Sequence, residues 1–467
     1  MSGYLLLVPE ILLLLGALVA LFGEFLPGKD RTAVLVGAGL CFVAAIAAWF
    51  GAVDESLFGG LLVSGPASNV IRVAIIALTG IWLLWLSARG YEDERSREAA
   101  ALALFSSIGG LLLTRSDELI TMFLALELST IPAYVLMGYR RRDIHGLEGA
   151  LKYFLLSMLT SLLMLYGLSL LYGISGTTHF DGIAEAVPEA GVLGLIAGVL
   201  TLVGLFAKLS AAPFHFWAPD AYAGAPAASV AFVSTVPKIA GTLVVVHVVE
   251  MLSGVTAFAL VLAVAAAASM LLGNLAALSQ LDTRRMMAYS GVAHTGYLFI
   301  GLAGAIAVGN ELGYLATLFY VIAYTVPSMA IMLVVAEEGD SVADLTQLAT
   351  RRPWLAWATM AWLLSLIGIP PLAGFFGKLY LFETGLEAGL VWLVVIGALT
   401  SVVSAAYYFR IARSMFLAPT AEAPERPAGQ IAPSRIADAA FVVALLATVA
   451  IGIAAAPVMT ALGWVVT

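Results

Sequence analysis

Long runs of apolar residues alternate with short polar stretches along almost the whole chain. Many of these runs hold about 20 residues, which is the length that an α-helix needs to cross the roughly 30 Å hydrocarbon core of a bilayer. Read on that rule, the pattern predicts an all-α polytopic membrane protein with fourteen spans. Their approximate bounds are 4–26, 32–52, 68–88, 98–113, 116–138, 147–173, 190–222, 227–250, 256–280, 286–306, 312–336, 354–386, 389–416 and 435–465.

The composition agrees with this prediction. Of the 467 residues, 62% are hydrophobic and 11% charged, whereas a soluble domain is about 45–50% apolar and about 25% charged. The formal net charge of −8 comes from scattered acids and argues against nucleic acid as a partner. Cys41 is the one cysteine, which excludes an internal disulfide and a cysteine-based metal cluster. The sequence contains neither a GxGxxG motif nor a P-loop, so we expect no redox cofactor, nucleotide or metal in this chain.

The sign of the charges between spans gives an independent check on the count. Loops after even-numbered spans carry acids or no charge, and basic residues gather after odd-numbered spans other than the seventh. The basic residues are Lys29 and Arg31; Arg89, Arg95 and Arg97; Arg140, Arg141 and Arg142; Arg284 and Arg285; Arg351 and Arg352; and Arg410, Arg413, Arg426 and Arg435. Arg72 and Arg115 are two exceptions. By the positive-inside rule, odd loops face the cytoplasm and both termini face the outside.

Spans 7 and 12 are too long for one straight crossing, and prolines interrupt both. The interruptions lie at 211–213 (AAP) and at 369–374 (IPPLAG). Non-helical backbone at membrane depth is tolerated where protein or water covers it, and paired interruptions mark the ion pathway of many transporters. Because the two interruptions are five spans apart, the units that contain them would be inverted in the membrane. Prolines that only kink their helices are the alternative.

Four of the five lysines lie within apolar runs, whereas nearly all of the seventeen arginines lie in loops. The four are Lys152, Lys208, Lys238 and Lys378. On insertion scales, each costs about 2.5–3.5 kcal/mol near the centre of a membrane. An arginine stays charged in a protein, but a buried lysine can lose its proton near neutral pH. The pattern therefore predicts proton handling inside the membrane.

A buried carboxylate in span 5 offers the natural partner for one of these lysines. Glu127 lies well inside that span, and Lys208, just before the interruption of span 7, is the best candidate for its cation. Moving the carboxylate away from a desolvated lysine would favour release of the proton, so the pair would act as a loading switch. A static ion pair between two helices is the alternative. For Lys208, Lys238 and Lys378 a second alternative is extension of the side chain to the membrane surface.

Other polar residues have two interpretations each. Glu148 and Lys152 are spaced for an i,i+4 ion pair at a helix end, or they belong to the pathway. His294, in span 10, either connects the two halves of the pathway or is a neutral, hydrogen-bonded core histidine. His215 and Asp220 follow the interruption of span 7 and form the mouth of a cytoplasmic half-channel or cap the broken helix. The aromatic residues are interpreted as lipid-facing packing.

Several segments resemble the antiporter-like subunits of respiratory complex I. These segments are 206–220 (FAKLSAAPFHFWAPD), 234–238 (STVPK), 273–278 (GNLAAL), 284–297 and 368–378. Within that group the chain is most similar to the N-type subunits. The similarity to that type is carried by 8–11 (VPEI), 126–132 (LELSTIP), 148–154 (EGALKYF) and by lysine at 378. The resemblance covers essentially the whole chain.

The resemblance implies a fold and a division of the chain. Spans 4–8 and 9–13 are expected to form inverted repeats around a polar axis in the middle of the membrane. The divisions are 1–95 (spans 1–3), 96–252 (first repeat), 253–417 (second repeat) and 418–467 (a linker and span 14). By their motifs, Glu127, Lys208, Lys238 and Lys378 are expected to carry the proton pathway.

The resemblance also implies a function. The chain is expected to be a proton-translocating membrane-arm subunit of NADH:quinone oxidoreductase in the bacterial inner membrane, surrounded by lipid and by related antiporter-like subunits. FMN, iron–sulfur clusters and quinone are expected in partner subunits. A subunit of a multisubunit Na⁺/H⁺ antiporter, or of a hydrogenase-linked relative, is the nearer alternative. A stand-alone transporter of a small solute is the more distant one, because it would need substrate-matching polar groups at the midplane.

Overall fold

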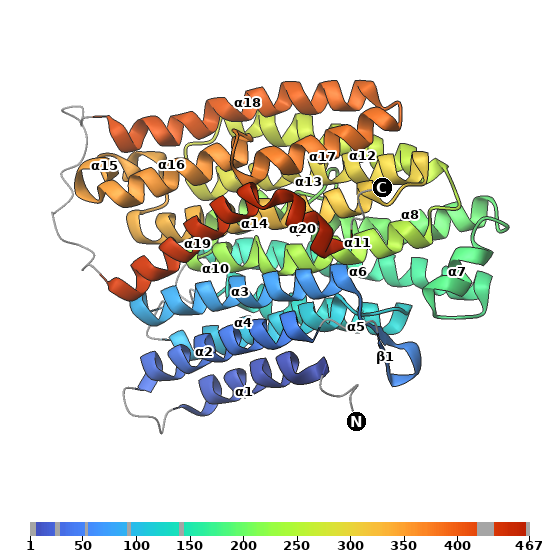
Figure 1. Cartoon of the computed structure of the whole chain (residues 1–467), viewed down its shortest axis with the longest axis horizontal. Coiled ribbons are helices and arrows are strands. Elements are labelled where there is room, and N and C mark those ends of the chain that lie inside the picture. Colours follow the sequence, from blue (N-terminus) through green and yellow to red (C-terminus); the bar gives the residue numbers. More distant parts are fainter. Residues whose placement is uncertain are drawn as a thin grey trace.

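Helices that run along one common direction make up almost all of the structure (Figure 1). The computed structural model describes residues 6–23, 29–51, 55–90, 95–139, 144–417 and 434–463. Within these ranges, eleven helical segments are long and apolar enough to cross a membrane, and three shorter apolar helices, α1, α8 and α16, complete the set. Together they correspond to the fourteen predicted spans.

The first seven spans are α1 (Val8–Phe22), α2 (Lys29–Phe50), α3 (Pro66–Arg89), α4 (Ser96–Leu113), α5 (Leu119–Met137), α6 (Ile144–Ser175) and α8 (Val192–Lys208) with α9 (Trp217–Gly224). The remaining seven are α10 (Ala227–Val233) with α11 (Val236–Met251), α12 (Ala257–Leu278), α13 (Thr283–Val308), α14 (Leu312–Glu338), α16 (Pro353–Ile367) with α17 (Ala373–Glu387), α18 (Val391–Phe416) and α19 (Arg435–Ile453) with α20 (Ala455–Leu462). Short elements lie between them: the antiparallel strands β1 (Ser56–Leu57) and β2 (Leu62–Val63) around η3 (Phe58–Gly60), then α7 (Phe180–Ala186), η5 (Val342–Leu345) and α15 (Leu348–Arg351).

Both predicted interruptions are present, and two further breaks were not predicted, one in span 8 and one at Ala454 in span 14. Span 7 is broken between α8 and α9, and span 12 between α16 and α17. At the second break Gly368 adopts φ +95° and its amide caps the last turn of α16, which suits glycine. Span 8 is also broken, at Ser234 and Thr235. Pro237 lies in the first turn of α11, where its missing N–H costs nothing, so it begins a new helix.

The order of the helices repeats with inverted orientation. α4 packs on α5 as α12 packs on α13, and α6 packs on α8 and α9 as α14 packs on α16 and α17. An isolated β-bridge joins Glu118, before α5, to His179, after α6, and a matching bridge joins Asp282, before α13, to Ser341, after α14. The first bridge adjoins α7 and the second adjoins η5 and α15, which lie at opposite ends of the helices (Figure 1). The predicted inverted repeats are therefore confirmed.

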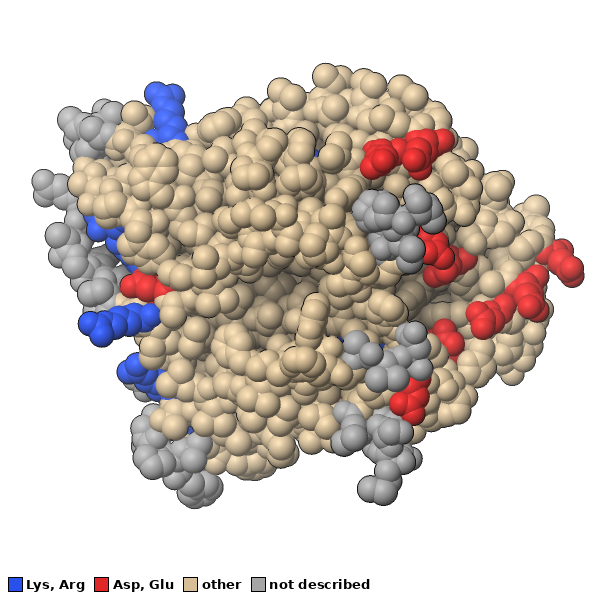
Figure 2. Space-filling model, in the orientation of Figure 1, with Lys and Arg blue, Asp and Glu red and all other residues tan. Residues whose placement is uncertain are grey.

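The charged side chains separate along the same axis. On the face shown in Figure 2, Lys and Arg gather at one end of the helices, whereas Asp and Glu lie mainly at the other. This agrees with the predicted alternation of loop charges. Four of the basic loop residues, Arg140, Arg141, Arg142 and Arg426, lie outside the described residues.

The two exceptions to that alternation are buried at the end that carries the β-hairpin. Arg72 Nη2 lies 2.6 Å from Glu10 Oε1, and Arg115 Nη1 lies 3.9 Å from the same oxygen. Both guanidinium groups also donate to the carbonyl of Leu6. Burial and the neighbouring Arg72 lower the pKa of Arg115 to about 10. These arginines belong to an internal ionic cluster, so they do not count as loop charges.

A second ionic cluster joins distant parts of the chain at the basic end. Glu337, at the end of α14, accepts hydrogen bonds from Trp85 and Arg89 of α3 at 2.9 and 2.8 Å. Arg352 pairs with the same carboxylate and also with Asp438 of α19, at 3.0 Å. The carboxylate of Glu337 thereby connects α3 to α14, and through Arg352 it is linked to α19.

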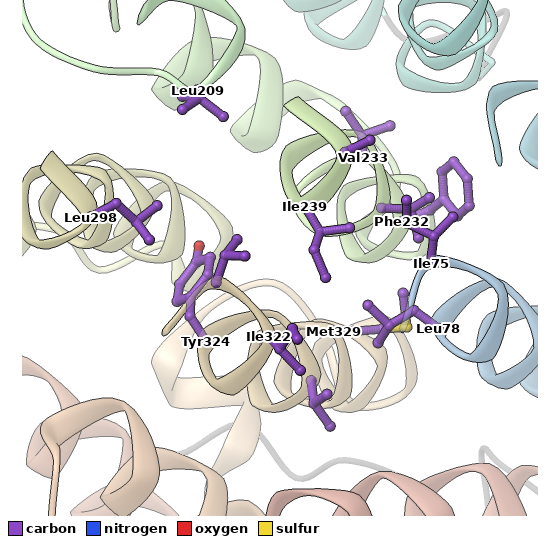
Figure 3. Close-up of a cluster of buried hydrophobic side chains, with 14 of the residues drawn as sticks. Ile75, Leu78, Leu209, Phe232, Val233, Ile239, Leu298, Ile322, Tyr324 and Met329 are labelled. Atoms are coloured by element: carbon purple, nitrogen blue, oxygen red, sulfur yellow. The ribbon is translucent and has the colours of Figure 1, made fainter. Parts of the chain in front are cut away.

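The helix α14 lies inside the apolar core and is buried along nearly its whole length. Figure 3 shows side chains from α3, α10, α11 and α14 converging on one another. They include Ile75, Leu78, Phe232, Val233, Ile239, Ile322 and Met329. A helix that is apolar on all sides is stable where protein surrounds it. This core holds α14 against α11, which carries Lys238.

The Glu10 cluster yields a test of stability. Glu10→Gln removes the carboxylate between two buried arginines, so we expect a loss of about 3–5 kcal/mol in the free energy of unfolding. The measurement is the thermal midpoint of the purified protein in detergent. Glu189→Gln, at an exposed glutamate, is the matched control. Equal midpoints for both variants would contradict the proposed role of Glu10.

Candidate functional site

Three of the four lysines predicted to lie in the membrane are enclosed by helices. Lys238 and Lys378 are each 5% exposed, and the side chain of Lys208 is 4% exposed. None of these side chains reaches the surface of the chain, so the alternative of extension to the membrane surface is wrong. Lys152 differs, because 45% of its side chain is exposed.

Lys208, the last residue of α8, pairs with Glu127 as predicted. Its Nζ lies 3.3 Å from Glu127 Oε1 on α5 and donates to the hydroxyl of Tyr134 at 2.6 Å. Ser161 of α6 donates to the same carboxylate oxygen at 2.7 Å. The end of α8 adds its negative partial charge, which also favours a cation there. Tyr134 is seven residues, or two turns, beyond Glu127, so both side chains face α8.

Lys238, near the start of α11, connects the two repeats. Its Nζ donates to the carbonyl of Gly291 on α13 at 2.8 Å. It also lies 5.2 Å from the centre of the Tyr324 ring on α14, within range of a cation–π contact. A lysine of the first repeat is thus held by two helices of the second.

His294 of α13 lies between Lys238 and Lys378. Its Nδ1 is 2.7 Å from the hydroxyl of Tyr320, and its Nε2 is 3.2 Å from the hydroxyl of Tyr408. Its ring centre is 4.5 Å from that of Tyr324 and 5.8 Å from that of Tyr297. Tyr324 contacts Lys238 and Tyr297 contacts Lys378. With a partner on each ring nitrogen, the histidine can accept a proton on one side and donate on the other.

Lys378, on α17, folds back onto the broken end of α16. Its Nζ donates to the carbonyls of Leu366 and Ile367 at 3.1 and 2.8 Å and to Ser401 Oγ of α18 at 2.7 Å. The last carbonyls of a helix lack intrahelical donors and carry negative partial charge. The interruption of span 12 therefore supplies the oxygens that hold this ammonium group. A Cβ at Gly368 would lie 3.1 Å from Lys378 Cδ, so a side chain there would displace the lysine.

Lys152 belongs to an ionic group at the wall of a cavity of about 450 Å³ near the basic end. Its Nζ lies 2.8 Å from Glu148 Oε1, as predicted for an i,i+4 pair, and 2.9 Å from Asp220 Oδ2. Arg285 pairs with Asp220 at 3.5 Å. Asp220 therefore lines an opening at the surface, whereas His215 is buried and is not part of this wall. The structure thus separates the two residues that were predicted to share a channel mouth.

Sequence reasoning missed the tyrosines of this site. The residues in question are Tyr134, Tyr297, Tyr320, Tyr324 and Tyr408. The interpretation of aromatic residues as lipid-facing packing was wrong for them, because all five are buried beside a lysine or histidine. The spacing of Tyr320 and Tyr324, one turn apart, is the signal that was available.

Comparison with known proteins identifies the family. The model of a family described as NADH:quinone oxidoreductase/Mrp antiporter, transmembrane, matches residues 116–404. The chain belongs to this family. The matched range contains Glu127, Lys208, Lys238, His294 and Lys378.

Individual members of the NADH:quinone oxidoreductase/Mrp antiporter family match nearly the whole chain. NADH-quinone oxidoreductase subunit N of Rhodospirillum rubrum is 37% identical, over 94% of this chain and 92% of that protein. A chain of respiratory complex I from Thermus thermophilus with bound aureothin is 31% identical, with a TM-score of 0.82 over 97% of this chain and 99% of that one. A chain of the Mrp complex from Dietzia sp. DQ12-45-1b is 21% identical, with a TM-score of 0.84 over 99% and 96%. At that identity the likeness shows the fold alone.

The Glu127–Lys208 pair gives a test that needs no transport assay. Glu127→Gln leaves the buried ammonium without its anion, and we expect a loss of about 3 kcal/mol in the free energy of unfolding. Adding Lys208→Met removes the unpaired charge, so the double variant should recover most of the stability. Thermal midpoints in detergent measure both effects. A double variant that is no more stable than the single one would show that the two residues do not interact.

Proposed function

We propose that this chain is the N-type antiporter-like subunit of a proton-translocating NADH:quinone oxidoreductase in the bacterial inner membrane. One observation carries the proposal: buried proton-carrying groups follow one another through both repeats. The series begins at Glu127 and Lys208, continues at Lys238 and His294, and ends at Lys378. The 37% identity to subunit N of Rhodospirillum rubrum supports this function over that of a multisubunit Na⁺/H⁺ antiporter.

In the proposed cycle, Lys208 is loaded from the cytoplasm while Glu127 is near. Movement of Glu127 away from Lys208 releases the charge, which passes through Lys238 and His294, and Lys378 releases a proton to the outside. Moving one charge against 100 mV costs about 2.3 kcal/mol. At 3.3 Å and an effective dielectric constant of about 20, the attraction within the first pair is about 5 kcal/mol. Loss of this attraction therefore lowers the affinity of Lys208 for its proton by more than the cost of the step, and separating the pair requires energy from outside it.

The surrounding complex would supply the energy. This chain is proposed to hold no redox centre, with FMN, iron–sulfur clusters and quinone bound by partner subunits. Energy would reach it through neighbouring membrane-arm subunits, including other antiporter-like ones. The basic end of the helices would face the cytoplasm, with both termini outside. Asp220, Glu148 and Lys152 at the open cavity of that end would exchange protons with the cytoplasm.

Purification from the native membrane tests the proposal. We expect the tagged protein, extracted in mild detergent, to bring with it material that oxidises NADH and contains flavin and iron–sulfur clusters. An untagged strain is the control. Recovery with other small membrane subunits and no redox centres would instead identify a Na⁺/H⁺ antiporter.

A further inference from the structure

A single hydroxyl group lies between the broken end of α8 and Lys238. Thr295 of α13 is completely buried, and its Oγ1 lies 2.7 Å from the carbonyl oxygen of Leu209 and 3.0 Å from that of Gly291. Leu209 directly follows Lys208. The carbonyl of Gly291 is the one that accepts the hydrogen bond from Lys238, at 2.8 Å. Thr295 therefore contacts both the segment that carries one lysine and the oxygen that holds the next.

The two acceptors compete for one proton, because a hydroxyl group donates a single hydrogen bond. Leu209 is the C-cap residue of α8, where carbonyls lack intrahelical donors, so its oxygen depends on outside donors such as Thr295. While Lys238 donates to Gly291, the hydroxyl of Thr295 is available to Leu209. When Lys238 withdraws, the carbonyl of Gly291 loses one donor and would compete more strongly for the hydroxyl of Thr295. A turn of the hydroxyl towards its own helix would then remove the hydrogen bond to Leu209.

Gly291 gives independent support for a close fit at this point. A Cβ added there would lie 3.1 Å from the hydroxyl oxygen of Tyr324 and 3.4 Å from Lys238 Nζ. The absence of a side chain lets both groups approach the backbone of α13. The position of Lys238 is therefore determined by the same turn of helix that carries Thr295.

We propose that Thr295 is a positioning residue that couples Lys238 to the broken helix end beside Lys208. The proton on Lys238 thereby changes the geometry at the previous lysine, which orders the two steps. This rests on the proposed function, since it concerns transfer along the same series.

The test compares Thr295→Val, which removes the hydroxyl at similar volume, with Thr295→Ser, which keeps it. Thr359→Val is the matched control, because Thr359 is also buried and its hydroxyl donates to Leu355 within its own helix. Protons moved per NADH oxidised are measured with the whole complex in membrane vesicles. Loss of one hydrogen bond worth about 1 kcal/mol corresponds to an approximately fivefold change in the equilibrium constant of this transfer step, which should lower the number of protons moved per NADH. We expect this decrease for Thr295→Val, with near-normal pumping for Thr295→Ser and Thr359→Val.

Two results would overturn this coupling. One is normal pumping by Thr295→Val, and the other is an equal decrease in the valine and serine variants. If the valine variant does not assemble, Thr295→Ala decides, since it removes the same hydroxyl with a smaller side chain: reduced pumping supports the coupling and normal pumping contradicts it. Lys238→Ala, measured in parallel, separates this proposal from the proposed function. Normal pumping by Lys238→Ala would contradict the proposed function itself. Reduced pumping by Lys238→Ala together with normal pumping by Thr295→Val would contradict the coupling alone.

Discussion

The fold depends on holding lysine amines between apolar helices. A charged group in that environment must be surrounded by oxygens, and a continuous helix uses its backbone oxygens internally. The chain meets this constraint mainly by breaking helices. The broken end of α16 presents two carbonyls to Lys378, and Lys208 sits at the broken end of α8 with a carboxylate opposite. At Lys378 the interruption itself therefore supplies the oxygens that hold the amine.

The same constraint explains why the two repeats are joined at the centre. Lys238 has no carboxylate partner within the described residues and uses a carbonyl of α13 instead. Tyr324 and His294 extend the contact towards Lys378 through α13 and α14. A movement of α13 would therefore change the contacts of lysines in both repeats. The ionic clusters around Glu10 and Glu337 lie towards the two ends of the helices, where the first joins α1 to α3 and the second joins α3 and α19 to α14.

The sequence predicted the features that depend on the free-energy cost of placing single residues or short segments in the membrane. The length of an apolar run predicts a span, and an isolated charge within it predicts a partner, so the spans and the Glu127–Lys208 pair could be derived. The break at Ser234 and Thr235 was missed because a proline in an apolar run suits both a kink and a new helix start. The contacts of Arg72 and Arg115 with Glu10 were also missed, since they depend on which helix faces meet.

The most direct test of the account is the number of protons moved per NADH oxidised when Lys208 is replaced by alanine. The complex would be assayed in closed membrane vesicles, with assembly measured as NADH oxidation by an artificial electron acceptor. An Arg31→Ala complex is the control, because Arg31 is exposed near the start of α2, outside the buried series. The account predicts fewer protons per NADH for Lys208→Ala in a complex that still assembles. A normal ratio in that complex would contradict the claim that the buried lysines carry the protons.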